Sequence, residues 1–67
     1  MEELIFLVKE SDEGGYIAQG VGISIITEAD SLPELKNEIK DAVHCHFEDL
    51  KKRLIRLHYV KEDYFTA

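Results

Sequence analysis

Apolar residues follow one another near the N-terminus in a pattern that predicts a strand. Residues 3–10 read ELIFLVKE, rich in branched and aromatic side chains. Alternate residues of a strand point to opposite faces, and here one face carries Leu4, Phe6 and Val8. The other face carries Ile5 and Leu7. Because both faces are mostly apolar, we expect both to be covered.

Three later segments also have the composition of strands. Their ranges are 15–19 (GYIAQ), 23–28 (ISIITE) and 54–60 (LIRLHYV). Gly14 and Gly15 can adopt positive φ in a turn that pairs the first two strands as a hairpin. Gly20 and Gly22 mark a tight reversal or a bulge before the third strand.

A helix is predicted between the third and fourth strands. Ser31 and Glu34 form a capping box, in which Ser31 caps the amide of Glu34 and Glu34 reaches back. From residue 32 the apolar positions recur at helical spacing as far as Leu50. We therefore expect the helix to run from residue 32 to about residue 50, before a turn at KKR of residues 51–53.

The predicted order is β-β-β-α-β, an α+β fold with one domain over residues 1–67. We expect a mostly antiparallel four-stranded sheet with the helix packed on one face. Since one helix covers only one face, the open face stays wet or meets another molecule, and a homodimer or higher oligomer joined through the sheet is the simplest solution. The candidate interface residues are Ile5, Leu7, Arg56 and His58. Arg56 and His58 can meet Ser24 or Glu28 across this face or contact a partner, and we favour an interfacial ion pair with Glu28 over an anion site. We expect Tyr64 and Phe65 of the loose 61–67 tail to add strand pairs or dock on a partner.

Length and charge restrict the class of protein. A 67-residue chain has a marginal core and usually needs disulfides, a metal or oligomerisation. Cys45 is the single cysteine, which excludes an internal disulfide and fits a reducing cytoplasm. The net charge of −6 disfavours direct binding of nucleic acid and suits a basic protein partner, or serves solubility alone. We find neither a membrane span nor a signal peptide in the sequence.

The segment AVHCHF of residues 42–47 invites a search for a metal or catalytic site. On a helix, His44 and His46 point roughly 160° apart and cannot share one ion. His46 falls on the apolar stripe, which predicts a partly buried core histidine, with Cys45 as a small hydrophobe.

The alternative is an oligomeric protein that binds a metal or small ligand through Cys45, His46 and His58 from assembled subunits. Nothing in the sequence predicts a phosphate loop, a nucleophile with its base or a carboxylate cluster for Mg²⁺. We therefore expect no catalytic residues, no cofactor and no enzyme.

Three stretches are similar to a known family. DEGGYIA (12–18), ITEADSLPEL (26–35) and IKDAVHCHFE (39–48) resemble the N-terminal domain of HicB-type antitoxins. The chain is still more similar to short, single-domain HicB-like bacterial proteins, which share EGGY, TEAD, DAV, CHF and IRLH in this order. It departs from full HicB antitoxins after GGY, where QGVGIS replaces a proline-rich segment.

The resemblance implies a partial sheet of the type found in double-stranded-RNA-binding domains, self-association, and binding to a HicA-type mRNA interferase. Such toxins are small and basic, and the antitoxin masks their catalytic histidine. The chain has no counterpart of the C-terminal DNA-binding domain of HicB antitoxins, so we do not expect it to bind operator DNA.

Overall fold

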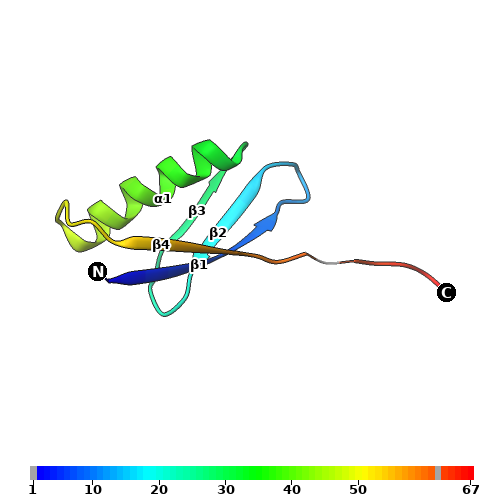
Figure 1. The fold of residues 1–67 in the computed structure, drawn as a ribbon. Coiled ribbons are helices and arrows are strands. Elements are labelled where there is room, and N and C mark those ends of the chain that lie inside the picture. The colour runs from blue at the N-terminus through cyan, green and yellow to red at the C-terminus, as the bar shows by residue number, and fades with distance from the viewer. Residues whose placement is uncertain (1, 62) are drawn as a thin grey trace.

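The computed structural model describes residues 2–61 and 63–67. Its elements are β1 (Glu3–Glu10), β2 (Tyr16–Gly20), β3 (Ile26–Ala29), α1 (Leu32–Phe47) and β4 (Leu54–Tyr59), as Figure 1 shows. The predicted α+β fold and its β-β-β-α-β order are confirmed. The prediction of a loose tail over residues 61–67 includes Glu62, which lies outside the described residues.

The four strands form one sheet in the order β3-β2-β1-β4. β1 and β2 pair antiparallel, as do β2 and β3, whereas β4 runs parallel to β1 with Leu57 opposite Phe6. A strand that follows a crossover helix returns in the direction of the strand before that helix, so β4 runs parallel to β3 and to β1. β2 already has two neighbours, which leaves the free sides of β1 and β3, and β4 pairs with β1.

The core lies between the helix and one face of the sheet. It comprises Leu4, Phe6, Val8, Ala18, Ile25, Leu35, Ile39 and Val43. The helical members are spaced four residues apart, so they form one stripe along α1. Burying each large apolar side chain of this kind contributes about 1.5–3 kcal/mol.

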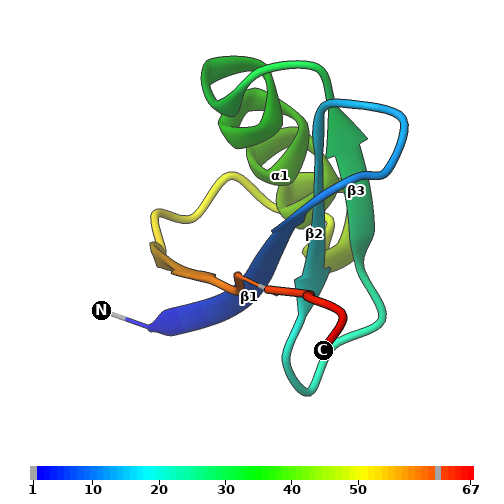
Figure 2. The ribbon, with the colours of Figure 1, turned by 90° about the vertical axis from the view of Figure 1, so that its right-hand side faces the viewer.

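The helix is displaced toward one side of the sheet. Only Asp30 and Ser31 separate β3 from α1, and the helix packs on β3 and β2. Figure 2 shows α1 above β2 and β3, with β4 to one side. As a result Ile55 and Leu57 of β4 are only half-buried, although they point to the same side of the sheet as the core.

Both ends of α1 have identifiable caps. The amide of Glu34 donates to Ser31 Oγ at 3.4 Å, which confirms the Ser31 half of the predicted capping box, whereas the return contact from Glu34 stays a prediction. The helix ends at Phe47, three residues before the predicted end, because Glu48 adopts a left-handed conformation with φ of 55°. The amides of Glu48 and Asp49 then donate to the carbonyls of Cys45 and His44, both at 3.3 Å, which closes a Schellman motif. Leu50, predicted on the helical stripe, is consequently 83% exposed.

The third strand begins at Ile26, later than the predicted residue 23. The chain needs residues 21–25 to reverse direction, with Gly22 at φ of 77°. The Gly20 amide donates to the carbonyl of Ile25 at 2.8 Å, and the Ile25 side chain enters the core at 5% exposure. The apolar residues before Ile26 therefore belong to a packed loop and not to the strand.

The face of the sheet opposite the helix is open in the single chain. The strand registers place Ile5, Leu7, Ile17 and Ile26 on this face among charged and polar residues. Leu7 is 42% exposed and Ile26 is 70% exposed. One helix covers one face, so this face of the first strand is uncovered within the single chain. Whether a second molecule covers it stays a prediction.

Candidate functional site

The histidines and the cysteine of AVHCHF lie in the last turns of α1. His46 is exposed, so the prediction of a core histidine is wrong, and Cys45 is also exposed. The reason is that the buried stripe of α1 ends at Val43 and Phe47 takes the next inward position. His46 contacts the Phe47 ring edge-on, with the ring centroids 4.9 Å apart.

His58 is not near the other two candidate ligands within one chain. It lies on the open face of β4, because it pairs with Leu7 there, whereas Cys45 and His46 belong to the helix on the opposite side of the sheet. Within residues 2–61 and 63–67 no group of three or more His, Cys, Asp or Glu side chains could hold a metal ion. A site shared by several subunits stays a prediction.

The four predicted interface residues do form one block. The parallel register sets Ile5 beside Arg56 and Leu7 beside His58 on the open face. Arg56 forms an ion pair with Glu3, with Nε 2.8 Å from Oε1. The predicted pair between Arg56 and Glu28 is wrong within the chain, because β3 and β4 are the two outer strands of the sheet. Whether this block binds a partner stays a prediction.

Arg53 has a structural role that sequence reasoning did not identify. Its guanidinium donates to both carboxylate oxygens of Asp49 at 2.9 Å and to Glu2 Oε1 at 2.6 Å. It also lies 4.1 Å above the centre of the Phe47 ring, and its side chain is only 6% exposed. Through these contacts Arg53 joins the end of α1, the following turn and the start of β1.

The contacts in the Arg53 cluster also shift the pKa values of Asp49 and Arg53. The hydrogen bond from Arg53 lowers the pKa of Asp49 from 3.8 to about 2, and the hydrogen bond to Asp49 raises the pKa of Arg53. Both groups are therefore charged at neutral pH. Their fixed pairing indicates a structural site rather than a reactive one.

The clearest concave polar surface is a groove at the opposite end of the molecule. It lies between the β1–β2 turn, the end of β3 and the first turns of α1, with a volume of about 580 Å³. Five acidic residues line it: Glu13, Glu28, Asp30, Glu34 and Glu38. Glu28 contributes at the edge of β3, because its pairing with Ile17 directs its side chain to the open face of the sheet. We call this surface, together with Ser11, Gly14, Tyr16, Ala29 and Asn37, the acidic groove.

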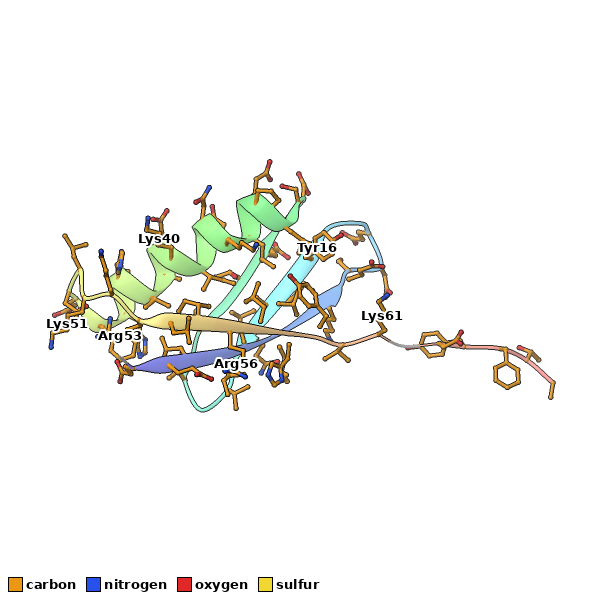
Figure 3. All side chains as sticks on the ribbon, in the orientation of Figure 1. Tyr16, Lys40, Lys51, Arg53, Arg56 and Lys61 are labelled. Atoms are coloured by element: carbon orange, nitrogen blue, oxygen red, sulfur yellow. The ribbon has the colours of Figure 1, made fainter. Side chains whose placement is uncertain are left out.

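No lysine or arginine lines the acidic groove in the described part of the chain. Figure 3 shows Lys51 and Arg53 far from Tyr16, beyond the C-terminal end of the helix, whereas Lys61 lies nearer to Tyr16 and lines a neighbouring pocket with it. The groove is therefore more acidic than the net charge alone indicates. All five acidic residues are exposed, and a surface lined by charges of one sign attracts the opposite charge.

The two glycines of the turn shape the wall of the acidic groove. Gly14 and Gly15 have φ values of 91° and 81°, as predicted for a turn that needs positive φ. A Cβ atom on Gly15 would lie 2.7 Å from the carbonyl oxygen of Ala29, whereas one on Gly14 would have nothing within 4 Å. Gly15 thus allows the turn to approach the end of β3.

Sequence reasoning missed the acidic groove because its carboxylates come from three separate segments. One local signal was available, since Glu34 and Glu38 are four residues apart and share a helical face. Their proximity to Glu28 depends on the pairing of β3 and on its short connection to α1.

Comparison with known proteins gives relatives from an archaeon and a bacterium. Over 49 residues, 73% of each chain, the protein is 55% identical to a UPF0150 protein of Archaeoglobus fulgidus. Over 61 residues, 91% of this chain and 87% of the other, it is 39% identical to a UPF0150 protein of Thermotoga maritima. No family model and no solved structure match. In the described residues, no helix has the length and apolar character to cross a membrane. The extent and identity of these matches show that the chain belongs to the UPF0150 family.

Proposed function

We propose that this protein is a non-enzymatic, cytoplasmic protein-binding module that receives a basic surface of its partner in the acidic groove. The observation that carries the proposal is the set of five carboxylates around one concave surface with no lysine or arginine in its lining. A Lys or Arg side chain of a partner would find several acceptors there, and charge-assisted hydrogen bonds are stronger than neutral ones.

The partner class that fits best is a small basic protein such as a HicA-type mRNA interferase. This choice rests on the resemblance of residues 12–18, 26–35 and 39–48 to HicB-type antitoxins, with which membership of the UPF0150 family is compatible. In this proposal the module masks the toxin by occupying its basic surface. The overall charge of −6 accelerates the encounter with such a partner.

The proposal is tested by co-expressing the chain with the product of the neighbouring open reading frame and isolating the complex. A small basic protein should co-purify, and raising the salt concentration should weaken the complex because salt screens exposed charges. Recovery of the chain alone, with no small basic protein encoded beside it, would contradict the antitoxin function.

Two matched double variants locate the contact. Glu34→Gln with Glu38→Gln removes two charges from the acidic groove, whereas Asp41→Asn with Glu48→Gln removes two charges from exposed positions outside its lining. Interfacial charge pairs of this kind contribute about 0.5–1 kcal/mol each, so the groove variant should bind about 5- to 30-fold more weakly. Equal affinities of the two variants would show that only net charge matters and that the groove is not the contact.

A further inference from the structure

The outer edge of β4 is open to pairing. In the described part of the chain β4 pairs with β1 on one side and with no strand on the other. The amides of Leu54 and Val60 donate toward β1, to the carbonyls of Glu2 and Val8. Alternate amides of a strand point to opposite sides, so those of Ile55, Leu57 and Tyr59 face outward. An edge strand with neither proline nor bulge is a template for another strand.

The side chains of β4 leave an apolar groove next to the same edge. This groove has a volume of about 430 Å³ and is lined by Lys36, Ile39, Ile55, Leu57 and Tyr59. It exists because α1 packs on β2 and β3 and does not reach over β4. Tyr59 is 54% exposed and Leu54, on the other face, is 50% exposed.

We infer that the occupant of this edge is a second copy of the chain, whose β4 pairs antiparallel with the first across a twofold axis at Leu57. In this arrangement Ile55 lies opposite Tyr59 of the partner subunit, and Leu54 lies opposite Val60 of the partner subunit. The apolar sides of the two β4 strands then form one continuous surface, on the side of the sheet that carries both helices. Pairs of aromatic and β-branched residues across strands are favourable.

The charges that flank β4 are complementary at its outermost pair. The basic residues 51–53 precede β4 and Asp63 follows it. Antiparallel pairing centred on Leu57 brings Lys51 opposite Asp63 of the partner subunit, and the twofold axis repeats this contact. The same pairing sets Arg53 opposite Lys61 of the partner subunit, but the charge of Arg53 is already paired with Glu2 and Asp49 of its own chain.

Neighbouring registers are less favourable. A shift that centres the axis on Arg56 sets two like charges opposite each other, which destabilises a strand pair. A shift that centres it on His58 sets Ile55 opposite Lys61 of the partner subunit. The register centred on Leu57 pairs Leu57 with itself, Ile55 with Tyr59 and Leu54 with Val60, and leaves Arg56 opposite His58 of the partner subunit as its polar pair.

Large apolar side chains are exposed on both segments that flank β4. Phe65 is 89% exposed on the segment that leaves β4, and Leu50 is 83% exposed on the segment that enters it. Figure 1 shows residues 63–67 extending away from the body. The same twofold axis directs this tail past residues 48–53 of the partner subunit.

Cysteine cross-linking of the full chain tests the register. Leu57 is the one residue of β4 that this symmetry sets opposite itself, at a Cα separation of about 5.5 Å, which a disulfide can span. In a Cys45→Ser background, Leu57→Cys should give a covalent dimer on mild oxidation. Ile55→Cys, the matched control on the same face, should cross-link at least about tenfold more slowly, because residues 55 of the two copies are about four residues apart along the strands. Equal rates for the two variants would overturn the inference.

Sedimentation across a range of concentrations tests the surface itself. The wild-type chain should be a dimer, and Tyr59→Lys should raise the dimer dissociation constant at least about tenfold while the circular dichroism spectrum stays unchanged. Tyr59→Pro, which removes an outward amide, should have the same effect if the lysine variant fails to fold. Leu7→Asp on the open face should stay dimeric. A monomeric wild type, or a dimer lost in Leu7→Asp and kept in Tyr59→Lys, would show that β4 is not the contact.

Discussion

The close approach of the β1–β2 turn to the end of β3 predicts different costs for two neighbouring glycines. An alanine at a position with positive φ costs about 1–2 kcal/mol, and this cost applies to both Gly14 and Gly15. At Gly15 the new Cβ also lies 2.7 Å from the carbonyl oxygen of Ala29, a backbone atom that cannot rotate away. Overpacking of this kind costs about 1–3 kcal/mol more.

We therefore expect Gly14→Ala to lower the free energy of unfolding by about 1–2 kcal/mol and Gly15→Ala by about 2–5 kcal/mol. Against a total of about 5 kcal/mol, the second change approaches complete unfolding. The assay is urea denaturation followed by circular dichroism, at one protein concentration because self-association stabilises the folded state. Equal losses in both variants would refute the steric argument, since only backbone conformation would then matter.

Three further predictions concern the core, the Arg53 cluster and the helix end. Phe6→Ala should cost about 3–5 kcal/mol because Phe6 is fully buried, whereas Leu7→Ala should cost less than about 1 kcal/mol, and equal costs in urea denaturation would contradict the assigned faces of β1. Because Arg53 holds the pKa of Asp49 at about 2, below the ordinary value of 3.8, the pair stabilises the fold fully above pH 3.8 and loses this effect as pH falls toward 2. Asp49→Asn should reduce the fall of the melting temperature between pH 3.8 and pH 2, and an unchanged pH dependence would exclude the role of the pair. Glu48→Gly should raise the free energy of unfolding by about 1 kcal/mol, since glycine adopts φ of 55° without strain, and a loss of stability would indicate a contact of the Glu48 side chain.

Sequence reasoning succeeded where the determining interactions are local. Ser31 and Glu34 stand three residues apart at the start of a periodic segment, and their capping contact depends on little else. The turn at Gly14 and Gly15 was likewise predictable, because positive φ strongly favours glycine. The face of β1 that enters the core follows from strict alternation.

Sequence reasoning failed where strand order or helix position decides the outcome. Arg56 was assigned to Glu28 because both were expected on the open face, but the sheet order places β3 and β4 at opposite edges and Arg56 pairs with Glu3. His46 was assigned to the core from its helical phase alone, which does not reveal where the supporting strands end. The acidic groove was missed for a related reason, since β3 and α1 bring its carboxylates together only in the folded chain.

The parallel partnership of β1 and β4 has a consequence for the order of events during synthesis. β1 is synthesised well before β4, so one side of this central strand has no partner until residues 54–59 have followed. The hairpin and the helix can form before then, but during most of translation the nascent chain exposes an apolar strand edge with unpaired backbone amides and carbonyls. Chaperone dependence or loss to inclusion bodies should therefore be most acute for chains that terminate just short of Leu54, and minimal once that last strand has docked.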